Sequence, residues 1–235
     1  MINVHWLGQV AYQTAWDQQK EYVQARLAAG PDRLLLLEHP PTYTHGRRAD
    51  LNNLLYDEPT RQQHGITLFA VDRGGDITYH GPGQLVGYPI LNIKQLHQQL
   101  YDRPRPDLHQ YLRDLEETLI LTLAQFGLRG WRYPGYTGVW LTTPHGPQKV
   151  AAIGIKVSAK GITSHGFALN INPNLAHFEG IIPCGIDDHG VTSMTARLGL
   201  PLTSADIIPH FLDAFHQIFK LAPTPLTPLP QPLPA

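Results

Sequence analysis

Two adjacent strands in the middle of the chain constrain its fold more than any other feature of the sequence. Lys149 to Val157 and Ile162 to Asn172 both have the composition of strands, and only residues 158–161 separate them. A connection this short joins antiparallel neighbours, whereas parallel neighbours need a long crossover. The middle of the chain is therefore not built from repeated βαβ units.

Further strands are predicted from short apolar runs that have turn-forming residues at both ends. They lie at 33–38, 86–91 and 138–141. A helix is predicted ahead of the first run, because apolar residues recur at helical spacing within 10–29 and Gly30-Pro31 follows them. Strands therefore occur on both sides of the central pair.

Two later helices complete the prediction. Asp107 is expected to cap the first of them and Gly127 to end it. Its core-facing residues are expected to be Leu108, Tyr111, Leu112, Leu115, Leu119, Leu123 and Phe126. Ser204 is expected to cap the last helix, which extends to Phe219. Helices interspersed with adjoining strands indicate the α+β class, with a mixed or antiparallel sheet.

Composition narrows the range of functions. The chain has 235 residues, 42% of them hydrophobic and 16% charged, and a formal net charge of -1, which argues against a dedicated nucleic-acid binder. No apolar run approaches the roughly 20 residues that span a bilayer. One cysteine and an N-terminus without signal-peptide character favour a reducing cytoplasm. We expect one domain over residues 1–221 and a disordered, proline-rich tail over 222–235.

The densest motif is the glycine-rich segment from Arg73 to Gln84. It has neither the spacing of a Walker loop nor that of a dinucleotide-binding GxGxxG turn. Its glycines allow the backbone to approach a bound group, while Arg73, Thr78 and His80 supply polar side chains. A plain glycine turn that enters a strand explains the segment equally well.

Cys184 is the single cysteine of the chain and lies between Pro183 and Gly185. Most lone cysteines are buried and inert, and a reactive one needs a nearby cation to favour its thiolate. The candidate cations are Lys149, Lys156, Lys160, His80 and His165. Sequence spacing does not choose among them, because the partners must meet in space. A metal site built from His80, His165, Cys184 and His189 has little support, since no tight HxxxH or CxxC pair occurs.

Several segments together resemble the lipoyl(octanoyl) transferase family. Residues 73–84 are similar to its RGG-x-x-TYHGPGQ signature, and residues 35–41 to its LLLEHPP element. Residues 149–154 and 165–170 resemble its two later elements, and the similarity extends from about residue 5 to 200. The resemblance implies the fold of the biotin and lipoate protein ligases, a single α+β domain with a mixed, mainly antiparallel sheet and flanking helices.

The resemblance also implies roles for individual residues. Cys184 corresponds to the acyl-carrying nucleophile, and Lys149 to the lysine that lowers the pKa of its thiol and takes part in proton transfer. The residues implied to bind substrate are Arg73, Gly74, Gly75, Asp76, Ile77, Thr78, Tyr79, His80, Ala152, Ile153, Gly154, His165, Gly166 and Phe167. No cofactor and no metal are implied.

The implied activity is transfer of an octanoyl group from octanoyl-acyl carrier protein to a lysine of a lipoyl domain, through an acyl-Cys184 thioester. This is the first step of endogenous protein lipoylation. The implied acceptors are the lipoyl domains of 2-oxoacid dehydrogenase E2 subunits and the glycine cleavage H protein. We expect a cytoplasmic monomer without a nucleic-acid or membrane partner.

Two alternatives remain at this point. An ATP-dependent lipoate or octanoate protein ligase resembles this chain around Gly74-Gly75 and at the lysine strand, but it normally has a histidine-aspartate pair where this chain has His80-Gly81. A catalytically silent relative that binds acyl chains or carrier domains is the other alternative. The presence of both Lys149 and Cys184 argues against it.

Overall fold

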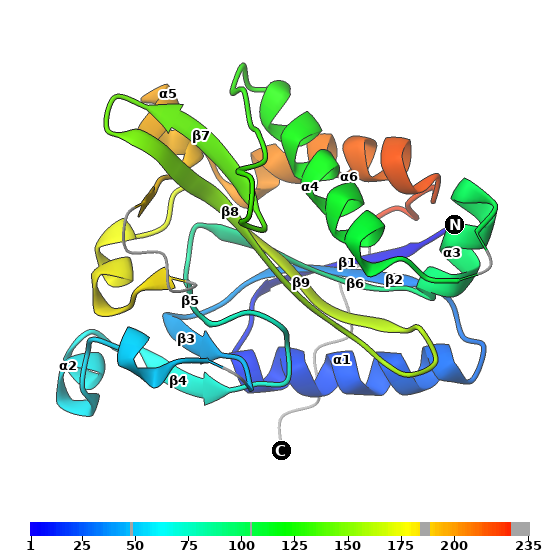
Figure 1. The fold of residues 1–235 in the computed structure, drawn as a ribbon, viewed down its shortest axis with the longest axis horizontal. Coiled ribbons are helices and arrows are strands. Elements are labelled where there is room, and N and C mark those ends of the chain that lie inside the picture. The colour runs from blue at the N-terminus through cyan, green and yellow to red at the C-terminus, as the bar shows by residue number, and fades with distance from the viewer. Residues whose placement is uncertain (48, 104, 184–188, 227–235) are drawn as a thin grey trace.

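The computed structural model describes residues 1–47, 49–103, 105–183 and 189–226. Within these residues seven strands form one sheet, in the order β1-β2-β6-β9-β8-β10, and β7 pairs with β8 (Figure 1). The strands are β1 (Asn3–Gln9), β2 (Arg33–Glu38), β6 (Gln84–Ile90), β7 (Val139–Thr143), β8 (Gly146–Val157), β9 (Thr163–Asn170) and β10 (Gly190–Val191). All five strands predicted from the sequence belong to this sheet.

The pairing in the main sheet is mixed but mainly antiparallel. β1 pairs with β2 and β10 with β8 in parallel, whereas β2, β6, β9, β8 and β7 are joined by antiparallel ladders. β8 and β9 form the predicted antiparallel pair, with Ala152 opposite Ala168 and Gly154 opposite Gly166. The predicted α+β class and sheet type are confirmed.

Helices cover both faces of this sheet (Figure 1). α4 (Leu108–Ala124) and α6 (Ser204–Phe219) pack together over one face, and α1 (Tyr12–Leu27) lies on the other. In β2, Leu34 and Leu36 join the core under α4 and α6, while Leu35 and Leu37 join the core under α1. This two-sided burial explains why the strand is a continuous apolar run, not an alternating one.

The helix ends agree with the sequence prediction in part. The Asp107 side chain accepts a hydrogen bond from the Gln110 amide, as predicted for an N-cap. Leu108 was expected in the core but is 47% exposed, since it is the first residue of α4 and joins none of the hydrophobic clusters that the described residues form. The cap of α6 is Thr203, which forms a capping box with Asp206, and Ser204 instead donates to Glu38 Oε1 at 2.6 Å.

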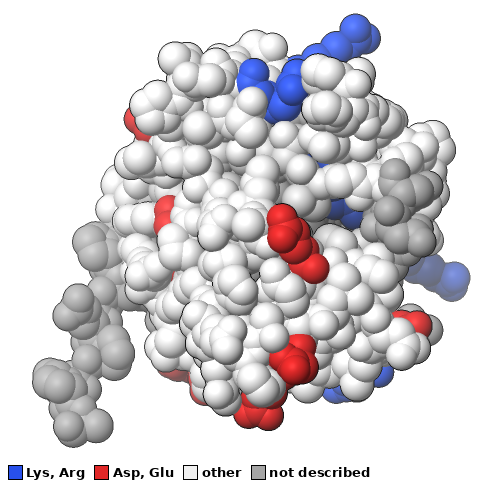
Figure 2. Space-filling model, turned by 90° about the vertical axis from the view of Figure 1, so that its left-hand side faces the viewer, with Lys and Arg blue, Asp and Glu red and all other residues white. Residues whose placement is uncertain are grey.

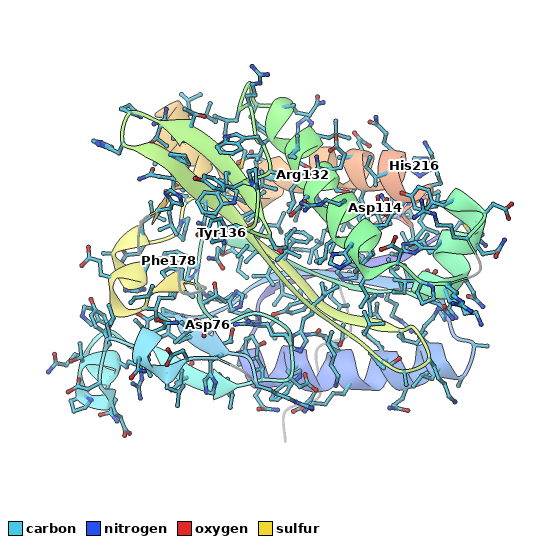
Figure 3. All side chains as sticks on the ribbon, viewed as in Figure 1. Asp76, Asp114, Arg132, Tyr136, Phe178 and His216 are labelled. Atoms are coloured by element: carbon cyan, nitrogen blue, oxygen red, sulfur yellow. The ribbon has the colours of Figure 1, made fainter. Side chains whose placement is uncertain are left out.

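A second sheet packs beside the N-terminal end of α1. Among the described residues it has three strands in the order β4-β3-β5: β3 (Thr42–His45), β4 (Thr67–Ala70) and β5 (Ile77–His80). Shorter elements surround the two sheets: η1 (Leu51–Asn53), α2 (Glu58–Gln63), α3 (Ile93–Tyr101), η2 (Leu175–Gly180) and α5 (Met194–Leu198). Phe178 of η2 packs into the small core of this sheet (Figure 3). The sequence prediction did not contain this sheet.

An irregularity in β8 determines where Lys149 points. Val139 pairs with Ala151 and Trp140 with Lys149, so Val150 is an extra residue that has no partner in β7. Val150 and Ala151 both lie in the core under α4 and α6. Such a bulge shifts the alternation by one residue. Lys149 therefore lies on the same face of the sheet as Ala152, the face toward α1.

The segment predicted as a tail begins on the folded body. The Ile2 amide donates to Ala222 O at 3.0 Å, and the Thr224 amide donates to Ile2 O at 2.9 Å. Residues 227–235 lie outside the described residues, so their predicted disorder remains a prediction. Within the described ranges no helix is long and apolar enough to cross a membrane.

Among the described residues, the surface on the side of the small sheet has no large patch of like-charged side chains. Figure 2 shows lysine and arginine side chains at its top edge and others along its right-hand side, with acidic side chains scattered between the centre and the lower edge. Most of this face is uncharged, in keeping with the 16% of charged residues in the sequence.

Gly83 offers a test of the turn between β5 and β6. Its φ is +81°, and a Cβ at this position would collide with the backbone carbonyl of Asn172. We expect Gly83→Ala to cost about 1 kcal/mol for the left-handed backbone and about 1–3 kcal/mol more for the collision. Gly135→Ala is the matched control, because Gly135 has a φ of +87° and no atom within 4 Å of its added Cβ. Urea unfolding measures both, and equal losses would contradict the predicted collision.

Candidate functional site

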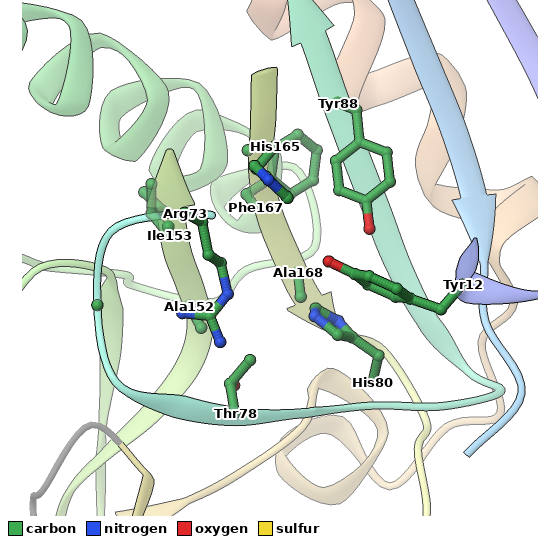
Figure 4. Close-up of a pocket in the computed structure, with 13 residues that line it drawn as sticks. Tyr12, Arg73, Thr78, His80, Tyr88, Ala152, Ile153, His165, Phe167 and Ala168 are labelled. Atoms are coloured by element: carbon green, nitrogen blue, oxygen red, sulfur yellow. The ribbon is translucent and has the colours of Figure 1, made fainter. Parts of the chain in front are cut away.

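A cavity lies where the two sheets and the N-terminal end of α1 meet (Figure 4). Its empty volume of about 440 Å³ includes solvent space at its open mouth. Its lining residues are Tyr12, Arg73, Gly75, Thr78, His80, Tyr88, Ala152, Ile153, Gly154, His165, Gly166, Phe167 and Ala168. The floor is formed by small residues of the β8–β9 pair, which leave room above the sheet.

The cavity brings together ten residues that the sequence implicated in substrate binding. They are Arg73, Gly75, Thr78, His80, Ala152, Ile153, Gly154, His165, Gly166 and Phe167. Segments that are far apart in the sequence thus meet in one place. Whether they bind substrate remains a proposal.

Four other implicated residues do not line the cavity. Ile77 and Tyr79 point into the core of the small sheet, because side chains alternate along β5 and leave Thr78 and His80 to face the cavity. Asp76, which is labelled in Figure 3, accepts from the Asp50 amide at 3.1 Å and from Asn53 Nδ2 and is not among the lining residues.

Gly74 completes this set of four. Its amide donates to Ile155 O at 2.9 Å, which ties the glycine-rich segment to β8.

Three lining residues were not anticipated. Ala168 follows from the alternation of the predicted strand, since it shares a face with Gly166. Tyr88 lies in a predicted strand, but nothing in the sequence around it distinguished it from a tyrosine of the core. Tyr12 begins α1, and no local motif marks it.

Arg73 is a buried cation in the cavity wall. Its Nη2 donates to Thr44 O at 2.7 Å and to Thr44 Oγ1 at 2.9 Å, and its Nη1 donates to Gly74 O at 3.0 Å. These contacts fix the guanidinium and hold the glycine-rich segment against β3. A Cβ at Gly154 would lie 3.1 Å from Arg73 Cδ, so β8 approaches closely here.

His80 presents a neutral imidazole. Gln84 Nε2 donates to Tyr79 O at 3.1 Å and to Asn170 Oδ1 at 2.9 Å, so its Oε1 faces His80 Nδ1 at 3.3 Å. Nδ1 must therefore carry the proton, which leaves Nε2 as an acceptor. Burial, followed by repulsion from His39 and Arg73, lowers the pKa of His80 well below its usual value.

A second hydrogen-bonded chain ends at Tyr12. His39 Nδ1 lies 2.7 Å from Val10 O and must donate to it, so its Nε2 accepts from the Tyr88 hydroxyl at 2.8 Å. Tyr88 in turn is hydrogen-bonded to Tyr12, and Figure 4 shows the two hydroxyls pointing toward each other. Burial raises the pKa of Tyr12 to about 12 and lowers that of His39 to about 4. All three groups are uncharged at neutral pH.

His165 lies at the opposite end of the cavity from Thr78 and His80 (Figure 4). Its Nε2 contacts Asp72 Oδ1 at 2.9 Å, and Asp72 Oδ2 accepts from Lys156 Nζ. The bond to His165 is the main cause that holds the pKa of Asp72 below its usual value. Burial nevertheless lowers the pKa of His165, so its ring is neutral and Nε2 donates to the carboxylate.

Lys149 is the buried cation at the other end of β8. It is 6% exposed, and its Nζ lies 5.0 Å from the centroid of the Trp140 ring. The parallel pairing of Val191 with Lys149 places β10 directly beside it. Cys184 lies outside the described residues, so its predicted role is not located here.

No metal site is found in the part of the chain that the structure describes. No group of three or more His, Cys, Asp or Glu side chains within it could hold a metal ion. His80 and His165 both line the cavity, but each is engaged by a protein side chain through one ring nitrogen.

Comparison with known sequences gives extensive matches. The profile of the lipoyl protein ligase A/B catalytic domain family matches residues 11–216. The octanoyltransferase of Rubrobacter xylanophilus is 46% identical over 213 residues, 90% of each chain. That of Chloroflexus aurantiacus is 43% identical over 223 residues, 94% of this chain and 96% of the other.

Solved structures share the fold at low sequence identity. A bi-partite lipoate protein ligase from Thermoplasma acidophilum, described with its E2 lipoyl domain, has a TM-score of 0.73 and 14% identity, over 98% of this chain and 88% of the other. Lipoate-protein ligase A bound with ATP has a TM-score of 0.72 and 13% identity, over 97% and 90%. At these identities the likeness shows the fold alone.

The neutral burial of His39 predicts how stability depends on pH. Its pKa of about 4 in the folded state lies below the ordinary value near 6.5, so the unfolded chain binds more protons between these values. Stability therefore falls as pH drops from 6.5 to 4, by up to about 3 kcal/mol for this group. In His39→Gln this part of the pH dependence of stability should disappear. Urea unfolding at several pH values measures it. The exposed His216→Gln is the control, and an unchanged slope in His39→Gln would contradict the assignment.

Proposed function

The chain belongs to the octanoyltransferases, within the family of the lipoyl protein ligase A/B catalytic domain, and we propose that it carries the octanoyl group as a thioester on Cys184. As an octanoyltransferase it is an acyltransferase that acts in protein lipoylation. The proposed donor is octanoyl-acyl carrier protein. The proposed acceptors are lysines of the lipoyl domains of 2-oxoacid dehydrogenase E2 subunits and of the glycine cleavage H protein.

The observation that carries this proposal is the position of β10. Gly190 and Val191 follow Cys184 closely in the sequence, and they pair with Gln148 and Lys149. The Thr192 amide also donates to Lys149 O at 2.9 Å. The chain that leads away from the sole cysteine is thereby anchored beside a buried lysine. A cation near a thiol favours the thiolate, which is the nucleophilic form.

The proposed reaction has two steps. The Cys184 thiolate attacks the thioester carbonyl of the donor, a new carbon–sulfur bond forms, and the carrier thiolate leaves and takes up a proton. The amine of the acceptor lysine then attacks the acyl-Cys184 carbonyl, loses a proton, and departs as an amide while the Cys184 thiolate is regenerated. Lys149 is proposed to stabilise the thiolate and to take part in these proton transfers.

Two steps suit two large carriers, because each can use the same site in turn. Conversion of a thioester to an amide is downhill, so the reaction needs no ATP. The alternative of an ATP-dependent ligase has less support, since the relatives that are 43–46% identical over most of the chain are octanoyltransferases.

The acyl chain is proposed to lie in the cavity. Its saturated carbons require apolar walls, and the methyl groups of Ala152 and Ala168 lie on the cavity face of the sheet. Arg73, Gly75 and Thr78 are proposed to line the end where the thioester reacts. Gly74, Asp76, Ile77 and Tyr79 are proposed to act through the shape of this segment, since they do not reach the cavity.

Substitution of Cys184 tests the covalent step. In Cys184→Ala, transfer of octanoyl from the carrier protein to a lipoyl domain should fall by at least about a thousandfold, because no nucleophile remains. Cys184→Ser should also be severely impaired, since a hydroxyl is far less ionised than a thiol. The measurement is the initial rate of lipoyl-domain acylation by mass spectrometry. Wild-type turnover by Cys184→Ala would rule out the thioester.

Alkylation of the thiol tests the role of Lys149. Because the chain has one cysteine, iodoacetamide reports Cys184 alone in the folded protein. Removing the cation in Lys149→Ala should shift the pH profile of alkylation upward by about one unit or more, whereas Lys149→Arg should shift it less. Lys94→Ala, on an exposed position of α3, is the control. A profile that is the same in Lys149→Ala as in the wild type would remove Lys149 from this role.

A further inference from the structure

We propose that Asp72, His165 and Lys156 form an end wall of the cavity that limits the length of the acyl chain. The inference rests on the proposed function in one respect, namely that the acyl chain occupies this cavity with its carbonyl toward Lys149. Within the wall, His165 would contact the methyl end of the acyl chain. Asp72 and Lys156 are positioning residues that hold His165 in place.

The wall is built from three segments. Asp72 follows β4, while Lys156 and His165 belong to neighbouring strands of the main sheet, β8 and β9. The carboxylate of Asp72 reaches both of them, with 2.9 Å from Oδ1 to His165 Nε2 and a contact from Oδ2 to Lys156 Nζ. One carboxylate thus ties the segment after β4 to the end of the β8–β9 pair.

The backbone of His165 departs from a regular strand to reach this position. Strand alternation would place His165 with Phe167, toward α4 and α6. Its φ of +55° is uncommon for a residue with a side chain, and its ring lies instead near Trp16 and Tyr88 on the face toward α1. The His165 amide donates to Gln19 Oε1 at 2.8 Å, which holds this conformation. Such unfavourable backbone persists where the surroundings enforce it, and it is concentrated at functional sites.

The imidazole presents a polar atom to the cavity end. His165 is 2% exposed, and among the described residues its Nδ1 has no hydrogen-bond partner. A methylene placed against this buried nitrogen would leave it without a hydrogen bond, whereas a polar group could supply one. The end of the cavity is therefore unfavourable for further apolar length, unlike its floor of alanine and glycine.

The length of the floor matches an eight-carbon chain. An extended chain advances about 1.3 Å per carbon, because its bonds of roughly 1.5 Å zigzag, so eight carbons span about 9 Å. The three steps along the strand from Ala152 to Ile155 span about 10 Å at the rise of a strand. Ile155 lies opposite His165. A chain whose carbonyl lies beside Ala152 therefore has its terminal methyl beside His165.

A second hollow lies beyond the wall. Its empty volume of about 480 Å³ includes open solvent, and its lining includes Gln19, Asp72, Lys156 and Ser164. His165 lines the cavity whereas Asp72 and Lys156 line the hollow, so the bonded trio separates the two spaces. Removing the Asp72 carboxylate should free the imidazole and give longer chains access to this hollow.

The test compares acyl chain lengths. Wild type and variants are given acyl carrier protein loaded with six-, eight-, ten- or twelve-carbon chains, and kcat/KM for transfer to a lipoyl domain is measured for each. The wild type should prefer eight carbons to ten and twelve. Asp72→Ala should raise the ten-to-eight and twelve-to-eight ratios by about tenfold. Lys156→Ala should raise them less, because the His165–Asp72 bond remains.

Two further variants make the result specific. Asp72→Asn has the size of aspartate and an oxygen that can accept from His165, so its length ratios should remain close to those of the wild type. Asp17→Ala removes a carboxylate from an exposed ion pair with Lys20 on α1 and should leave the ratios unchanged. If Asp72→Ala does not fold, His165→Ala takes its place with the same expectation.

The outcome separates this inference from the proposed function. Formation of octanoyl-Cys184 by the wild type tests the proposed function, and its absence would overturn that proposal. If the adduct forms but Asp72→Ala and His165→Ala have the wild-type length ratios, the end wall is wrong.

Discussion

The antiparallel pairing of β8 with β9 is the interaction on which the rest of the site depends. The pair supplies the floor of the cavity from Ala152 to Gly154 and from Gly166 to Ala168, together with Lys149 at one end and His165 at the other. A slip of one residue in this register would turn every floor residue to the opposite face. Register is fixed because the other face packs under α4 and α6.

Two local departures from regular strand geometry then direct the polar groups at the ends. The extra residue Val150 places Lys149 on the cavity face, beside β10. The left-handed φ of His165 brings its ring to the same face. Between them the wall is neutral apart from Arg73, since burial lowers the pKa of His80 and His39 and raises that of Tyr12. A cavity whose walls are neutral apart from one arginine suits a saturated chain that ends in a reactive carbonyl.

The sequence predicted much of the fold, because periodicity and turn residues act locally. In this way the sequence predicted the strands at 33–38 and 86–91, the β8–β9 pair and the Asp107 cap. The small sheet was not, since its short strands carry no clear alternation and are stabilised by contacts with η2 far along the chain. The motifs predicted most of the cavity lining, but Tyr12, Tyr88 and Asp72 are placed by tertiary contacts that no local pattern encodes.

The central claim is that Cys184 carries the acyl group during turnover, and trapping the acyl-enzyme tests it most directly. The protein is mixed with octanoyl-acyl carrier protein, quenched in acid within milliseconds to seconds, and analysed by intact mass and peptide mapping. The account predicts an increment of one octanoyl group on the Cys184 peptide, which a lipoyl domain then removes at least as fast as the enzyme turns over. Turnover without this adduct, or an adduct that decays more slowly than turnover, would contradict it.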